Sequence, residues 1–113
     1  MEKNYDDFVQ LFRKELPKVQ FIEFHARSLE TLKWIMVTIT DLGVFQSLWK
    51  IFELWLNKHN NASIKVSYKS IEGKLIEITY NSLNKKEVED ILSRNPPVLD
   101  SKTKIILNEE LPI

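Results

Sequence analysis

The residues best suited to chemistry lie in the stretch VQFIEFHAR, where Glu23, His25 and Arg27 alternate. Alternating residues of a β-strand lie on one side, so this carboxylate and imidazole could act together as an acid and a base. The stretch itself contains neither a nucleophile nor a second carboxylate. We therefore interpret the stretch as a solvated strand face. A small enzyme that combines this face with a remote partner such as Tyr68 or Lys104 is an open alternative.

Sequence motifs of common enzyme classes are missing. The chain contains no cysteine, which excludes disulfides, thiolate catalysis and cysteine-ligated zinc. It also lacks the H-E-x-x-H and G-x-S-x-G motifs, and its two glycines cannot form a dinucleotide-binding loop. The sequence thus predicts no catalytic residues, no cofactor and no metal site.

Length and composition predict one folded domain over residues 1–113. Hydrophobic residues make up 43% of the chain and charged residues 28%, as in ordinary globular proteins. Sixteen Lys and Arg balance sixteen Asp and Glu. Nucleic-acid binding normally needs a basic face, so we expect no direct binding of DNA or RNA, although folding could still gather lysines onto one face.

Hydropathy predicts a protein without membrane segments. No run approaches eighteen apolar residues, and the N-terminal stretch MEKNYDDFVQLF lacks the apolar centre of a secretion signal. We expect a cytoplasmic location, and the small number of lysines on the most apolar helix argues against contact with a membrane surface.

The pattern of apolar residues predicts an α+β fold with two layers. Asn4 can cap a first helix that ends at Pro17, and Asn84 can cap a last helix, with Leu83 and Val88 as its hydrophobic staple. The expected order is helix, strand, strand, helix, strand, strand, helix, over residues 4–16, 19–27, 34–40, 44–56, 63–70, 75–80 and 85–94. Residues 28–36 could instead form a helix. Residues 102–107 are expected to form a short edge strand, and residues 108–113 a flexible tail.

The central helix carries the stretch FQSLWKIFELWL, from Phe45 to Leu56. On a helical wheel its apolar residues occupy an arc of roughly 160°. The centre of the arc is the right width to lie on a sheet, which predicts that Leu48, Ile51, Phe52 and Trp55 belong to the core.

Large apolar residues at the border of this arc are candidates for contact with a partner. Trp49 and Leu56 lie at the border, and Leu54 interrupts the polar side. For Trp49 and Leu56, burial in the core is an equally good interpretation. The predicted partner-binding residues are Phe45, Trp49, Leu54 and Leu56.

The segment FELWLNKHNNASIKVSYKSIEGKLIEITYNSLNKKEVEDIL consists of a helix that ends in Trp-Leu, two strands joined by a turn with glycine, and a short charged helix. In this order it resembles the C-terminal half of the bacterial effector-associated constant component domains, over about residues 44–92. The resemblance implies a non-enzymatic linking or regulatory domain of a bacterial conflict (defence) system. It also implies a cytoplasmic protein whose partners are effectors such as protease, caspase-like or NTPase modules.

A second class of function fits the same features. An antitoxin or immunity protein that inhibits a partner by direct binding would also be small, free of cysteine and dependent on contacts. In both cases the domain acts by binding a protein effector or by self-association, so we expect a dimer or a hetero-complex.

Overall fold

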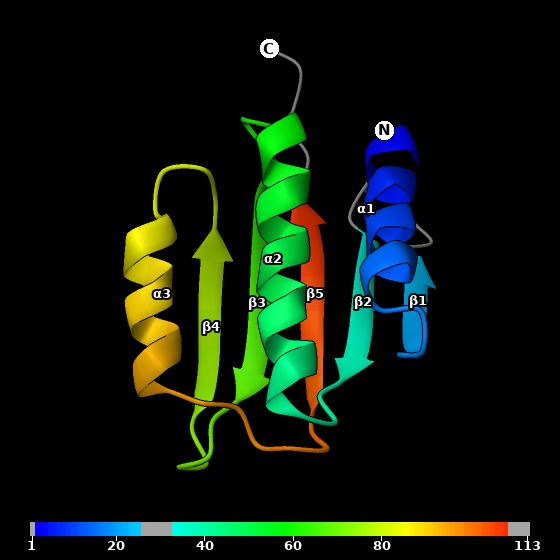
Figure 1. Cartoon of the computed structure of the whole chain (residues 1–113). Coiled ribbons are helices and arrows are strands. Elements are labelled where there is room, and N and C mark those ends of the chain that lie inside the picture. The colour runs from blue at the N-terminus through cyan, green and yellow to red at the C-terminus, as the bar shows by residue number, and fades with distance from the viewer. Residues whose placement is uncertain (1, 26–32, 109–113) are drawn as a thin grey trace.

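Within the described residues the chain forms three helices and five strands (Figure 1). The structure is a computed structural model that describes the backbone of residues 2–25 and 33–108 and the side chains of residues 6–21 and 34–108. The elements are α1 (Glu2–Glu15), β1 (Phe21–His25), β2 (Lys33–Thr38), α2 (Leu42–Lys58), β3 (Ser63–Lys69), β4 (Leu75–Tyr80), α3 (Lys85–Arg94) and β5 (Lys102–Asn108).

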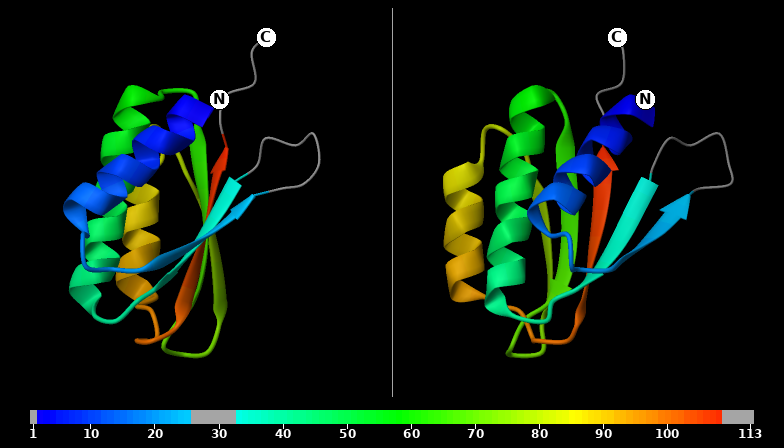
Figure 2. Two further views of the ribbon diagram at one scale, coloured as in Figure 1. Left: turned by 90° about the vertical axis from the view of Figure 1, so that its right-hand side faces the viewer. Right: turned by 45° about the vertical axis from the view of Figure 1, so that its right-hand side comes forward.

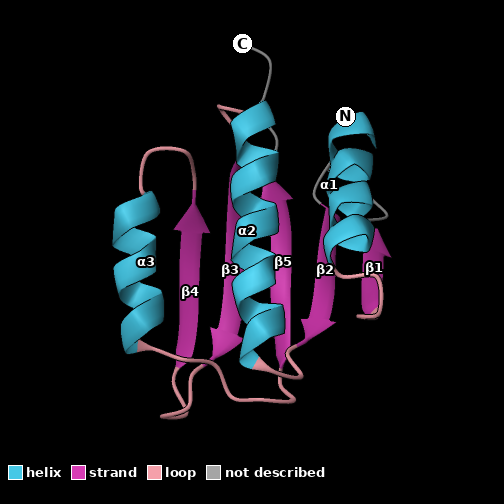
Figure 3. Ribbon diagram, in the orientation of Figure 1, coloured by secondary structure: helices cyan, strands magenta, loops and turns pink. Residues whose placement is uncertain are grey.

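The strands form one antiparallel sheet in the order β1-β2-β5-β3-β4. A layer of helices lies against it, and the predicted two-layer α+β fold is confirmed (Figure 3). The predicted hairpin is also present as β3 and β4, whose register pairs Val66 with Ile78. Residues 33–38 form a strand, which settles the open choice for that part of the chain, whereas residues 28–32 lie outside the described residues.

The last strand does not lie at an edge, so this prediction was wrong. β5 lies between β2 and β3 and pairs with both, and it extends to Asn108. Its alternating side chains Thr103, Ile105 and Leu107 are buried beneath the helices. A central position requires two neighbours that are distant in sequence, and local polarity does not reveal them.

The described helices all lie on one side of the sheet (Figure 2). The apolar side chains of that sheet face and of the helices form one cluster. Its largest fully buried members are Trp55, Tyr68, Phe8, Phe12, Phe52, Ile35, Ile39, Leu48, Ile51, Leu56, Ile64 and Ile105. The opposite face of the sheet carries no described helix.

Local signals explain where α2 begins and where the chain turns between β3 and β4. The side chain of Asp41 caps α2, since its Oδ1 accepts a hydrogen bond of 2.9 Å from the backbone N–H of Val44. Gly73 has a φ of 85° in the turn between β3 and β4, a conformation that favours glycine. The sequence therefore encodes this helix start and this turn directly.

The predicted cap Asn4 was wrong, and the predicted cap Asn84 holds in position but not in its hydrogen bond. α1 begins at Glu2, so Asn4 lies inside the helix. Asn84 does precede α3, but its side chain makes no capping bond and instead donates to the carbonyl of Thr79 and accepts from the N–H of Asn81. Leu83 is 93% exposed and cannot act as a staple. The side chain of Asn84 therefore forms its hydrogen bonds with the turn after β4 instead of with the first turn of α3.

Candidate partner-binding groove

α2 places its apolar side on the sheet as predicted. Leu48, Ile51, Phe52 and Trp55 are all fully buried. The ring of Trp55 lies edge-on to Phe8 of α1, with 6.2 Å between centroids, and next to the ring of His59 at 4.7 Å. Trp55 therefore joins α1, α2 and the sheet in one core.

Two of the four predicted contact residues are buried: Leu56 follows the alternative of burial in the core, and Phe45 contributes only to the lining of the groove described below. Leu56 is 2% exposed and Phe45 is 6% exposed. A helical wheel gives the direction of a side chain, but it does not show that α1 and α3 pack on either side of α2 and widen the covered arc. Trp49 and Leu54 are partly buried and remain accessible.

Trp49 lies in a group of aromatic rings. Its ring centroid is 5.0 Å from that of Phe52, 5.5 Å from that of Tyr80 and 6.1 Å from that of Phe45. The indole Nε1 of Trp49 is buried and has no hydrogen-bond partner among the described residues. A buried donor without an acceptor costs about 1–3 kcal/mol, so the ring contacts must offset this cost.

A groove runs between α2 and α3, and Trp49 lines it along both halves. One half has a volume of about 400 Å³, and its lining includes Pro96 and Pro97, which follow α3. Its lining consists of Leu42, Phe45, Gln46, Trp49, Leu92, Ser93, Pro96 and Pro97. None of these described residues carries a charge. Leu42 at the rim is 51% exposed, so this half presents apolar surface to the solvent.

The other half of the groove has a volume of about 230 Å³ and is bordered by charges. The ammonium of Lys85 donates a hydrogen bond of 2.7 Å to Glu53 across the groove, and this bond raises the pKa of Lys85. Burial, followed by the nearby carboxylate of Glu53, raises the pKa of Tyr80. Both halves share Gln46, Trp49 and Leu92, so together they form one surface with an apolar end and a charged end.

The proposed acid–base face is only partly described. In the register of β1, Glu23 pairs with Ile35 and His25 with Lys33; the side chains of Glu23 and His25, and all of Arg27, lie outside the described residues. This face therefore stays a prediction.

The two remote partners considered for this face lie on opposite faces of the sheet. Tyr68 is 1% exposed beneath the helices, and its hydroxyl donates a 2.6 Å hydrogen bond to the carbonyl of Asn95. Burial raises the pKa of Tyr68 to about 12, so it stays protonated at neutral pH. Lys104 lies on the open face.

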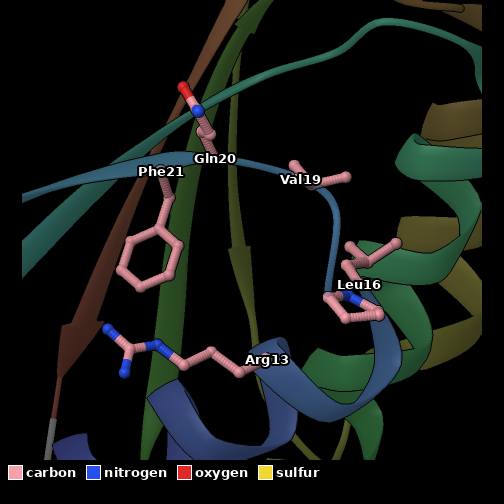
Figure 4. A pocket seen from close by; sticks show the side chains of 6 residues that line it. Arg13, Leu16, Val19, Gln20 and Phe21 are labelled. Atoms are coloured by element: carbon pink, nitrogen blue, oxygen red, sulfur yellow. The ribbon is translucent and has the colours of Figure 1, made fainter.

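A wider hollow of about 690 Å³ lies between the end of α1 and the start of β1 (Figure 4). Figure 4 shows the side chains of Arg13 and Phe21 extending toward one another, and the guanidinium carbon lies 5.6 Å from the ring centroid. Gln20 points away from them. Arg13 is the one titratable residue in the described lining, which provides no acid–base pair.

The described part of the chain has neither a grouped set of metal-binding side chains nor a helix that could span a membrane. Among these residues, no three His, Cys, Asp or Glu side chains are grouped so that they could hold a metal ion. Likewise, no helix formed by them has the length and apolar character needed to cross a membrane.

Comparisons of the chain with models of protein families, with curated proteins and with solved structures find no match.

Proposed function

We propose that the domain is a non-catalytic interaction domain that binds a protein partner in the groove between α2 and α3. The observation that carries this proposal is the apolar half of the groove, which holds about 400 Å³ and is lined by no charged side chain. Catalytic sites need polar groups that converge on the reacting atoms. An apolar concavity on a protein rich in charged surface is instead typical of a contact site.

The groove also indicates the chemistry of the partner segment. Leu42, Trp49 and Leu92 offer contacts to aliphatic or aromatic side chains, whereas Lys50, Glu53 and Glu89 border the other half. An amphipathic helix with apolar residues on one side and charged residues near one end would match both halves, in the way that helices commonly bind in grooves.

The resemblance to the effector-associated constant component domains supplies the class of partner. We extend the proposal to an effector of a bacterial conflict system, such as a protease, caspase-like or NTPase module, contacted in the cytoplasm. An antitoxin or immunity protein would use the same kind of contact, and the identity of the bound protein separates the two.

The experiment compares groove variants with a matched control. Leu42→Glu places a charge at the apolar rim, and Ser93→Arg fills the groove with a long cation; both residues are exposed, so the fold should survive. Leu83→Glu makes the same change at an exposed leucine outside the described groove lining. Tagged forms are expressed in the cells that encode the protein, and co-purifying proteins are identified and reconstituted with the purified domain.

The wild type and Leu83→Glu are expected to bind the same partner. Leu42→Glu and Ser93→Arg should weaken the reconstituted complex by about 30-fold or more, since each places a charge against an apolar contact and loss of a hot-spot contact costs about 2 kcal/mol or more. Circular dichroism checks that all four proteins are folded. Equal affinities of the folded groove variants and the control would rule out the groove as the binding site.

A further inference from the structure

The open face of the sheet is basic, although the whole chain carries no formal net charge. The strands alternate, and their outward positions on β3 and β5 carry four lysines: Lys65, Lys69, Lys102 and Lys104. On the neighbouring β4, Glu77 is the one acidic residue among the described outward positions. Folding has therefore separated the charges and concentrated cations on the face without described helices (Figure 2).

These lysines differ from the cations of the helical layer. On the helices, Lys85 pairs with Glu53 and Arg94 pairs with Asp90. None of the four sheet lysines forms an ion pair with another residue in the described part of the chain. The charges of the exposed Lys65, Lys69 and Lys102 are therefore directed to the solvent, where they attract anions, whereas the ammonium of Lys104 lies over the ring of Trp34.

An aromatic ring lies beside these lysines. Trp34 of β2 is opposite Ile106 of β5, which is opposite Lys65 of β3, so a ring, an aliphatic side chain and a cation follow one another across three strands. In the adjacent row, the ammonium of Lys104 lies 4.4 Å from the centroid of the Trp34 ring. Both Trp34 and Ile106 are partly exposed.

We propose that this open sheet face binds single-stranded nucleic acid, with the phosphates along the lysines of β3 and β5 and a base next to Trp34. Proteins that bind single strands combine a positively charged surface that follows the backbone with aromatic side chains on which bases stack. Lys102 and Lys104 are two residues apart on one strand, about 7 Å, and β3 lies about 5 Å from β5. This close spacing allows several neighbouring phosphates to be bound together.

The same features disfavour other occupants. A second copy that used this same face would bring four lysines against four lysines, and like charges repel. Binding to a membrane surface requires a broad set of apolar groups that enter the headgroup region, whereas the outward positions of β3 and β5 carry Lys, Ser and Asn side chains, with Ile106 as the one apolar residue. A purely acidic peptide would leave the aromatic ring without a role.

The test uses the purified full chain and labelled oligouridine and oligothymidine of about 16 nucleotides, the upper range of common site sizes. The double variant Lys65→Glu and Lys69→Glu is compared with Lys58→Glu and Lys86→Glu, which makes the same charge change at exposed positions of the helices. Fluorescence anisotropy is measured from about 50 to 200 mM salt.

We expect the wild type to bind at least one single strand with an affinity that falls as salt rises. The sheet variant should bind at least tenfold more weakly, with a slope of log affinity against log salt that is smaller by about 1.4, or 0.7 for each phosphate that the protein no longer neutralises. The helix variant should keep the wild-type slope. Trp34→Leu should weaken binding by about five- to hundredfold with little change in slope, since this variant removes stacking and leaves the charge unchanged.

Three results would overturn the proposal. The first is the absence of single-strand binding at low salt. A protein that binds only vesicles of phosphatidylserine would also give this result. The second is equal or tighter binding of a duplex of the same length, which would exclude recognition by stacking. The third is an equal decrease in affinity in the sheet and helix variants. Because the groove variants leave this face unchanged, the outcome is independent of the proposed protein partner.

Discussion

The hydroxyl of Tyr68 should make the stability of the domain depend on pH. It lies where the end of α3 meets the sheet. It donates a 2.6 Å hydrogen bond to the carbonyl of Asn95, and its ring lies edge-on to Phe45 at 5.1 Å, beneath the apolar half of the groove. Tyr68→Phe keeps the ring and removes the hydroxyl. We expect a loss of about 1–2 kcal/mol in the free energy of unfolding at neutral pH, because the partly buried carbonyl of Asn95 loses its donor.

The pH dependence of this loss follows from the pKa. Burial raises the pKa of Tyr68 from 10.0 to about 12, so the folded state favours the neutral phenol. The stability that Tyr68 contributes is then fully present below about pH 10 and is lost as the pH rises toward 12. At 1.36 kcal/mol per pKa unit, the wild type should lose about 1.4 kcal/mol through this group by about pH 11, and the variant should lose none of it.

Urea unfolding of both proteins at about pH 8 and about pH 11, followed by tryptophan fluorescence, measures the difference. The two proteins differ in no other ionisable group, so the comparison isolates Tyr68. The stability gap between wild type and Tyr68→Phe should shrink by about 1.4 kcal/mol at the higher pH. A gap that stays constant would refute the assignment of a raised pKa to this residue.

Two further substitutions test the core and the hairpin. Trp55→Ala should lower the free energy of unfolding by about 3–5 kcal/mol, because it leaves a large cavity among fully buried rings; a loss below about 1 kcal/mol in chemical denaturation would contradict this packing. Gly73→Ala should cost about 1–2 kcal/mol through its φ of 85°, although its Cβ would meet no atom within 4 Å; wild-type stability in the same assay would show that the turn relaxes without strain.

Local patterns in the sequence predicted much of the fold. The arc of apolar residues on α2 predicted the buried face around Trp55, and alternation with a central glycine predicted the hairpin of β3 and β4. These features depend on residues close in sequence. The position of β5 depends on pairing with β2 and β3, which are far from it in the chain, so alternation alone left it at an edge.

The candidate sites also combine residues that local sequence predicts with residues that only tertiary contacts bring together. Trp49 was predicted from its border position on α2, whereas Leu92, Pro96 and Pro97 join it only because α3 lies beside that helix. The lysines of the open sheet face are visible as alternating residues in each strand. These lysines form one basic surface only because β5 lies beside β3. The balanced total charge of the chain gave no sign of this surface.

A photo-reactive crosslinker in place of Gln46 tests the central claim most directly, because this exposed residue lines both halves of the groove. The control carries the same group in place of Glu72, an exposed residue of the hairpin turn. Irradiated in the cells that encode the protein, the Gln46 form should give one discrete crosslinked protein, and Leu42→Glu in the same chain should abolish that product. Equal products from positions 46 and 72, or a product that survives Leu42→Glu, would contradict partner binding in the groove.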